Sequence, residues 1–278
     1  MRSLFDAVSE KSSKLTTQSY STSFTMGIRL LDKKYHQPIY NLYGFVRFAD
    51  EIVDTFSDQD QRLLLDEFKA ATHLAIKRNI SLNPILNAFQ KTVNAYKIEA
   101  ELYDTFLASM YMDLDPQEYD RATYEKYILG SADVVGLMCL RVFCEGNESQ
   151  YEQLKPYAMK LGSAFQKVNF LRDVKNDTSN LGRIYFPDVQ NEGFGKEQKA
   201  AIEKDIENDF KEALKGIQQL PAGAQLGVYA AYTFYRALFK KLQATSFEHL
   251  LKERVRIPDF LKLLLVMRSY VQCRLGMV

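Results

Sequence analysis

Apolar residues recur at helical spacing along most of the chain, and this pattern predicts a series of α-helices. Over residues 38–56 the apolar positions surround the helix on nearly all sides, which is typical of a helix buried in a core. Residues 124–143 and 151–176 are predicted to form two further long apolar helices. The alternation of apolar and polar residues that indicates a half-buried strand is nearly absent. The sequence therefore predicts an all-α protein whose central helices are unusually apolar.

Residues that start or end helices set the boundaries of other predicted elements. Asn83 followed by Pro84 is typical of an N-cap and a first helical residue, and it predicts a helix as far as Tyr96. Pro221 and Pro258 likewise predict the starts of two late helices. These late helices run to residues 242 and 274, and amphipathic helices are predicted at 63–75, 102–110 and 197–219. Because no repeat or linker interrupts the chain, we expect one domain over residues 1–278.

Composition and charge exclude several classes of protein. The chain has 13 glycines and 7 prolines, a low content of helix breakers, and its 36 basic and 35 acidic residues leave a net charge of only +1. It therefore lacks the global positive field of a nonspecific nucleic-acid binder, and we expect no nucleic-acid partner. Three cysteines without CxxC spacing predict neither disulfides nor a zinc site. No signal-like or membrane-spanning run is present, so we expect a cytoplasmic protein that is at most peripherally attached to membranes.

Two pairs of aspartates are spaced four residues apart, which places both side chains of a pair on one face of a helix. The first pair is Asp50 and Asp54, and the second is Asp173 and Asp177, with Asn169 extending the second row by one turn. Such side chains are close enough to share a cation. Hard oxygen ligands suit Mg²⁺, which proteins commonly hold through one or two carboxylates together with substrate phosphates.

The surroundings distinguish these two pairs from Asp205 and Asp209, which have the same spacing. Asp205 and Asp209 lie in a strongly charged segment, so we interpret them as part of a solvated helix face. The two pairs above have apolar neighbours, and burying a carboxylate is costly unless a cation compensates its charge. A metal site explains this pattern. The alternative is that the carboxylates form buried ion pairs with Arg47 and Arg172.

Basic and hydroxyl side chains near these aspartates indicate an anionic substrate. A diphosphate needs cationic donors beside the metal, and Arg47, Arg172 and Arg183 are candidates. Ser21 and Ser23 could donate hydroxyl groups to a phosphate, although ordinary helix capping explains them equally well. The 17 tyrosines and 18 phenylalanines could wall a water-poor cavity, since ring faces stabilise cations without attacking them.

Other chemistries find little support in the sequence. The three histidines are scattered in polar segments without metal-ligand spacing, which argues against a histidine-based triad or a zinc hydrolase. Neither a P-loop nor a GxGxxG motif is present. The residues by themselves therefore predict an all-α, Mg²⁺-dependent enzyme that acts on a diphosphate with an apolar tail.

The motifs and their order resemble those of the squalene/phytoene synthase family of head-to-head prenyl transferases, and most closely the bacterial phytoene synthases. Together they extend over nearly the whole chain, which makes the resemblance far more specific than any single DxxxD pair. The matching stretches are YSTSF at 20–24, YGFVRFADEIVD at 43–54, YILGSADVVGLM at 127–138, LGSAFQKVNFLRDVKND at 161–177, GRIYFP at 182–187 and RVRIP at 254–258.

The resemblance implies the isoprenoid-synthase fold, in which two acidic helices face each other across a central cavity and bind Mg²⁺ and two prenyl diphosphates. One departure is visible, since the first motif contains Glu51 where many relatives have aspartate. Glu51 keeps the charge and lies off the face that Asp50 and Asp54 share, so we expect little effect. The implied metal ligands are Asp50, Asp54, Asn169, Asp173 and Asp177. The implied diphosphate contacts are Ser21, Ser23, Arg47, Arg172 and Arg254. The residues implied to line the site or to assist ionisation and proton removal are Tyr43, Tyr127, Gln166, Tyr185 and Tyr235.

The family's chemistry implies a two-step reaction. Metal-assisted loss of diphosphate gives an allylic cation, which the second donor captures as a cyclopropylcarbinyl (prephytoene) diphosphate, and rearrangement with proton loss then gives the product. The leading expectation is a phytoene synthase of carotenoid biosynthesis that condenses two geranylgeranyl diphosphates with Mg²⁺, or Mn²⁺ in its place, and without NADPH. The alternatives are a squalene or dehydrosqualene synthase that uses farnesyl diphosphate, and a noncatalytic prenyl-lipid-binding protein. Because substrates and products are lipids, we also expect peripheral membrane contact; no protein partner is indicated.

Overall fold

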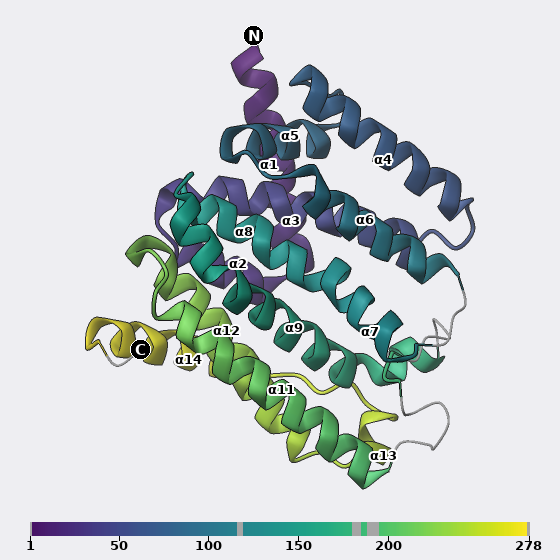
Figure 1. The fold of residues 1–278 in the computed structure, drawn as a ribbon, viewed down its shortest axis with the longest axis vertical. Coiled ribbons are helices and arrows are strands. Elements are labelled where there is room, and N and C mark those ends of the chain that lie inside the picture. Colours follow the sequence, from purple (N-terminus) through teal and green to yellow (C-terminus); the bar gives the residue numbers. More distant parts are fainter. Residues whose placement is uncertain (1, 116–118, 180–184, 188–194, 277–278) are drawn as a thin grey trace.

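The fold is built from packed α-helices (Figure 1). Their buried apolar side chains form the interior. The computed structural model describes residues 2–115, 119–179, 185–187 and 195–276, apart from the side chains of 176–179, 196, 247, 248 and 259. Within these ranges no residue lies in a β-strand, which confirms the predicted all-α class. The first helices are α1 (Arg2–Tyr20), α2 (Thr22–Arg29), α3 (Lys33–Asp54), α4 (Gln61–Arg78), α5 (Pro84–Tyr96) and α6 (Ala100–Leu114).

The second part of the chain supplies the long helices at the centre. α9 packs against α8 on one side and against α11 and α12 on the other, so it forms the central support of the fold (Figure 1). α14 lies against α12. These elements are α7 (Arg121–Ile128), the π-helical turn η1 (Leu129–Asp133), α8 (Val134–Cys144), α9 (Glu148–Ser179), α11 (Lys196–Ile217), α12 (Ala222–Gln243), α13 (Phe247–Leu250) and α14 (Asp259–Arg274).

Most predicted helix boundaries are confirmed, and one start is wrong. The side chain of Asn83 accepts hydrogen bonds from the backbone of Ile85 and Leu86, so the predicted cap of α5 is present. α3 was expected to begin at Pro38 but begins at Lys33, with the proline inside the helix. The first turn of α3 is fixed by Tyr35, which is buried against the core and offsets the cost of the interior proline.

The predicted burial of α3 is also confirmed. Phe45 lies at the centre of the first half of the core, where its ring stacks on that of Phe89 at a centroid distance of 3.8 Å. Close helix crossings depend on glycine: a Cβ at Gly162 would lie 2.7 Å from the carbonyl oxygen of Ala132. α9 therefore approaches η1 more closely than any side chain at this position would permit.

The solvated face predicted for Asp205 and Asp209 is wrong for Asp209. Its side chain is only 2% exposed and accepts hydrogen bonds from Lys160 and Lys167, each of which lies on α9. Lys167 also donates to the half-buried Asp205. The charged segment predicted the helix correctly. It did not show which side of α11 packs against α9, and that side carries these ion pairs.

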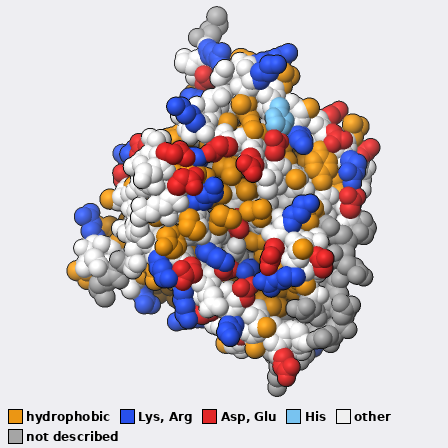
Figure 2. Space-filling model, in the orientation of Figure 1, with side chains coloured by type: hydrophobic (Ala, Val, Ile, Leu, Met, Phe, Trp, Pro, Cys, Tyr) orange, Lys and Arg blue, Asp and Glu red, His pale blue; other side chains and the backbone are white. Residues whose placement is uncertain are grey.

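Two further surface and hydropathy predictions concern the whole molecule. Figure 2 shows a face on which acidic and basic side chains are interspersed, as expected for a net charge of +1. One continuous helical stretch, Arg121–Cys144, is long and apolar enough to cross a membrane by length and composition, but 72% of its most apolar window is buried inside the protein. This stretch therefore packs as a core helix.

Candidate active site

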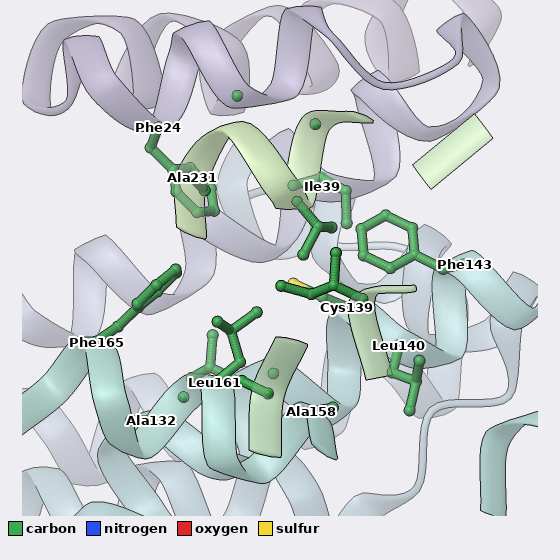
Figure 3. Close-up of a pocket in the computed structure, with 18 of the residues that line it drawn as sticks. Phe24, Ile39, Ala132, Cys139, Leu140, Phe143, Ala158, Leu161, Phe165 and Ala231 are labelled. Carbon is green, nitrogen blue, oxygen red and sulfur yellow. The ribbon is translucent and has the colours of Figure 1, made fainter. Parts of the chain in front are cut away.

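An elongated apolar cavity of about 320 Å³ lies between helices α2, α3, α8, α9 and α12. Figure 3 shows Leu161 and Cys139 pointing into it, with Phe165 on one side and Phe143 and Leu140 on the other. The volume is within the range of small-molecule sites, and the walls are almost entirely hydrocarbon or aromatic. Such a cavity fits a long apolar ligand and keeps water away from it.

Polar side chains gather at one end of this cavity. Tyr43, Gln166, Asn169 and Tyr235 are all lining residues, and all four belong to the predicted site. Along α9 the lining extends from Asn169 to Leu154, which corresponds to about 22 Å at 1.5 Å per residue. The cavity is therefore long and has one polar end.

Both acidic helices continue past this polar end. On α3 the cavity is lined by Tyr43 and Val46, and Asp50 follows one turn later on the same face. On α9 the last lining residue is Asn169, and Asp173 follows one turn later. The structure thus places one predicted carboxylate from each helix beyond the polar end of the cavity.

Tyr43 and Tyr235 connect the two sides of the polar end. The Tyr43 side chain is hydrogen-bonded to Ser21 and is close enough to Asp50 and Tyr235 for their charges to act on it. The hydroxyl group of Tyr235 donates to Asn169 Oδ1 over 3.3 Å. Burial, reinforced by the charge of Asp50, raises the pKa of Tyr43 to about 12, so this phenol remains protonated near neutral pH.

Asp173 is held between two arginines. Arg172 Nε donates to both carboxylate oxygens at 3.0 and 3.1 Å, and Arg254 Nε donates to Oδ1 over 2.6 Å. Burial lowers the pKa of Arg172, but the hydrogen bond to Asp173 and the charges of Asp173 and Tyr235 together outweigh it, so the pKa lies above its ordinary value. The ion pair between Asp173 and Arg172, which was the alternative to a metal site, is therefore present. Arg254, from a motif far along the chain, adds a second guanidinium group to the same carboxylate.

The environment of Arg47 differs from the prediction. Arg47 forms an ion pair with Glu51, one turn further along α3, and its guanidinium group lies 4.4 Å from the ring centroid of Tyr20. Within the described part of the chain, Arg47 Nε is buried without a hydrogen-bond acceptor. Asp50 is half-buried, whereas Asp54 is exposed, so the expectation of an apolar interior was wrong for Asp54.

Tyr127 and Tyr185 lie in a separate aromatic cluster and do not line the cavity described above. Both hydroxyl groups donate to Asp113, Tyr127 over 2.7 Å and Tyr185 over 3.0 Å. The Tyr185 ring also stacks on Phe170, the residue after Asn169, at a centroid distance of 4.3 Å. Burial and the Asp113 charge raise the pKa of Tyr127 well above its usual value. Leu161, Phe165 and Tyr235, which line the cavity, pack against the same cluster, so the two tyrosines support the cavity wall from behind.

The sequence did not indicate Asp113. It has no motif spacing to either tyrosine, and only the tertiary fold brings α6, α7 and residue 185 together. The pairing of Arg47 with Glu51 could have been found from the sequence, since opposite charges four residues apart meet on a helix.

Four further residues of the predicted site are Ser21, Ser23, Asp177 and Arg183. Ser21 caps α2 by accepting a hydrogen bond from the Phe24 backbone over 3.2 Å, as the capping interpretation proposed, and it also contacts Tyr43. Ser23 is half-buried in the first turn of α2. The side chain of Asp177 lies outside the described residues, as does Arg183.

The donor chemistry at the polar end fits Mg²⁺. Asp50, Asp54, Asn169 and Asp173 supply only oxygen atoms, and each helix contributes the one or two carboxylates that Mg²⁺ takes when phosphate and water complete its shell. No cluster of three or more His, Cys, Asp or Glu side chains is found among the described residues.

Solved structures share this architecture. A dehydrosqualene synthase in complex with a ligand superimposes with a TM-score of 0.81 at 21% identity, covering 98% of this chain and 97% of the other. The squalene synthase of Alicyclobacillus acidocaldarius gives a TM-score of 0.74 at 18% identity, covering 85% of this chain and 93% of the other. The protein thus has the all-α isoprenoid synthase fold, as predicted.

Sequence comparison identifies the family. The family profile of squalene/phytoene synthases matches residues 17–260, and the chain belongs to this family of prenyltransferase-type enzymes. A 15-cis-phytoene synthase of Pantoea ananas is 26% identical, covering 80% of this chain and 79% of its own length. Phytoene synthase 1 of Arabidopsis thaliana is also 26% identical, covering 84% of this chain but 59% of its own. A presqualene diphosphate synthase of Rhodopseudomonas palustris is 27% identical, covering 60% of this chain and 58% of its own.

Proposed function

We propose that the protein is a phytoene synthase, which joins two geranylgeranyl diphosphates head to head in a Mg²⁺-dependent reaction of carotenoid biosynthesis. The observation that carries the proposal is the long apolar cavity with one polar end, beyond which Asp50 and Asp173 extend from two different helices. A prenyl diphosphate has the matching form, an apolar tail with an anionic head.

The side chains of the polar end can bind and orient the diphosphate. Arg172 and Arg254 present guanidinium groups whose planar donor pattern matches phosphate oxygens. Arg47 has a buried Nε directed at no acceptor among the described residues, and it can turn from Glu51 towards an anionic ligand. Mg²⁺ held by Asp50, Asp54, Asn169, Asp173 and, by family resemblance, Asp177 would neutralise diphosphate charge and favour its departure.

The cavity walls suit a reaction that passes through carbocations. Phe24 and Tyr43 pack at a centroid distance of 5.0 Å, and Phe165 stacks on Tyr235 at 3.9 Å, so aromatic faces border the polar end. Ring faces stabilise a cation electrostatically without forming a bond to it. The apolar walls exclude water, which would otherwise trap such an intermediate as an alcohol.

The length of the cavity favours the longer prenyl donor. A C20 chain has about sixteen main-chain carbons and a C15 chain about twelve; because bonds of about 1.5 Å meet at an angle, the extended chains are about 19 Å and about 14 Å long. The lining along α9 extends for about 22 Å. The curated phytoene synthases named above also align over 80% and 84% of this chain, against 60% for the presqualene diphosphate synthase. Both observations support geranylgeranyl over farnesyl diphosphate.

Product analysis tests the proposal. Purified protein is incubated with Mg²⁺ and either geranylgeranyl or farnesyl diphosphate, with and without NADPH, and the extracted lipids are separated by mass and absorbance. We expect a C40 hydrocarbon with the ultraviolet spectrum of phytoene, formed without NADPH. A C30 product from farnesyl diphosphate, with no C40 product, assigns the protein to the squalene or dehydrosqualene synthases. The absence of any condensation product favours the noncatalytic lipid-binding alternative.

A further inference from the structure

The apolar residues of α14 face away from the protein. Phe260, Leu263, Leu264, Met267 and Val271 recur at helical spacing on one side of this helix, and all are exposed, from 49% at Met267 to 69% at Phe260. Tyr270 and Leu275 extend the same surface, which we call the α14 apolar face. A contiguous apolar surface of this kind usually marks an interaction site.

The opposite side of α14 attaches the helix to the protein through polar groups. Ser269 is fully buried, and its hydroxyl group shares a hydrogen bond of 2.6 Å with Thr233 on α12. Gln272 accepts a hydrogen bond from Tyr229 over 3.3 Å. Leu261 and Cys273 also pack against the core from this side. α14 therefore has apolar residues on its outward side in addition to those that face inward, unlike an ordinary surface helix, whose outward side is polar.

The segment around this face is basic. Residues 251–275 contain six lysines and arginines but only two acidic residues, although the whole chain is nearly neutral. Arg268 and Arg274 are exposed on α14 itself, and Arg256 is exposed just before it. An apolar surface bordered by cations complements a bilayer with anionic headgroups, where cations meet phosphates and apolar side chains enter the acyl region.

The α14 apolar face lies near the polar end of the cavity. Lys262 Nζ donates to Thr22 Oγ1 over 3.3 Å, and Thr22 lies between the two serines of the YSTSF motif. The segment that leads into α14 contains Arg254, which binds Asp173. A partner on this face would therefore contact the protein beside the candidate active site.

We infer that α14 is an interfacial helix that docks the protein on an anionic lipid bilayer. With 16 residues it is shorter than the roughly 20 needed to cross a membrane, so it lies in the plane of the surface. A second copy of the chain fits this face less well, because a symmetric contact would bring two sets of like charges together. Docking would place the cavity next to the phase in which a C40 hydrocarbon dissolves; this consequence alone rests on the proposed function.

Vesicle flotation with the full chain tests the inference without any prenyl substrate. Vesicles are made from phosphatidylcholine alone or from an equimolar mixture with phosphatidylglycerol. We expect the wild-type protein to float with the anionic vesicles and to be released by high salt. In Met267→Glu/Val271→Glu the bound fraction should fall about tenfold, because two carboxylates cannot enter the acyl region. The matched control is Leu63→Glu/Leu74→Glu, which makes the same change at exposed leucines of α4.

A second variant and two further measurements complete the test. Arg268→Gln/Arg274→Gln should lose the preference for anionic vesicles, and circular dichroism should show unchanged helix content in every variant. Equal binding by the α14 double variant and the wild-type protein overturns the inference, as does an equal loss in the α4 control. A wild-type dimer that the α14 variant converts to a monomer would assign this face to a second copy instead. Product formation in detergent is measured separately, so failure of docking and failure of the proposed function are distinguishable.

Discussion

Arg254 and Asp173 are 81 residues apart in the sequence, yet Arg254 Nε donates to Asp173 Oδ1 over 2.6 Å. The contact joins the segment before α14 to the acidic motif of α9, and Arg172 binds the same carboxylate from the other side. Two guanidinium groups thus share the carboxylate that we propose as a Mg²⁺ ligand. In the proposed function, the same contacts orient both arginines towards a diphosphate.

Loss of the Arg254 guanidinium group should weaken substrate binding. In Arg254→Gln we expect KM for the prenyl diphosphate to rise about tenfold or more, because a charge-assisted contact to phosphate contributes roughly 1.5 to 3 kcal/mol. Steady-state kinetics checks this value. Arg256→Gln is the matched control, since Arg256 is exposed two residues away, and it should leave KM unchanged. Equal KM values in the two variants would remove Arg254 from the site.

The metal role proposed for Asp173 predicts a different kinetic effect. Asp173→Asn keeps the shape of the side chain but removes the charge that binds Mg²⁺, so turnover should fall by orders of magnitude. Helix content, measured by circular dichroism, should not change. Asp115→Asn is the control, because Asp115 also pairs with an arginine, Arg62 at 2.6 Å, but is exposed and does not line the cavity. Near-normal turnover of Asp173→Asn would contradict the assigned role.

Cavity length can be shortened by one substitution. Ala158 points into the cavity from α9 (Figure 3), and a phenylalanine there would fill the space below the polar end. We expect Ala158→Phe to lower C40 formation from geranylgeranyl diphosphate about tenfold or more, while the shorter farnesyl diphosphate becomes the better substrate. The ratio of the two products measures this change. Ala70→Phe on the exposed side of α4 should not alter that ratio.

The sequence was sufficient to predict most of the helices from α3 onwards and the two acidic motifs, because both depend on local spacing. No helix was predicted where α1 and α2 lie. The Asn83 cap and the three-to-four-residue apolar repeat act within one or two turns, so both can be recognised without knowledge of the tertiary structure. Asn169 was predicted from its spacing to Asp173, and Tyr43, Gln166 and Tyr235 from the family resemblance; all four line the cavity.

Other features could not be predicted because they depend on which helix faces pack together. The charge pattern alone predicted that Asp209 lies at the surface, whereas the packing of α11 on α9 buries its side chain. Asp113 and its two tyrosines are separated by up to 72 residues and share no motif. Pro38 is a helix-start signal in isolation, and only the burial of Tyr35 explains why the helix starts earlier.

The buried position of Asp209 predicts an effect on stability. Asp209→Asn would leave Lys160 and Lys167 without their shared carboxylate, and removing one partner of a buried ion pair costs about 3 kcal/mol or more. Asp205→Asn removes a half-exposed partner and should lower the free energy of unfolding by about 1 kcal/mol or less. Urea denaturation compares the two variants. Equal losses would show that burial does not distinguish the two carboxylates.

Asp133 should make the stability depend on pH. Its side chain is 7% exposed, and burial raises its pKa to about 7, although Ser163 donates a hydrogen bond to it over 2.7 Å. The folded pKa is above the unfolded value near 4, so between these pH values the folded state binds the proton more tightly. The contribution to the free energy of unfolding is therefore present at low pH and is lost as pH rises from about 4 to about 7.

Asp133→Asn removes this titration and tests its sign. The free energy of unfolding, measured with urea at pH 5 and pH 8, should fall less with rising pH in the variant than in the wild-type protein. The full shift of about three pKa units corresponds to about 4 kcal/mol, of which about 3 kcal/mol is lost between pH 5 and pH 8. Asp115→Asn, an exposed aspartate, should retain the wild-type pH dependence. If Asp133→Asn retained it as well, the Asp133 carboxyl would not be the group that couples folding to protons in this range.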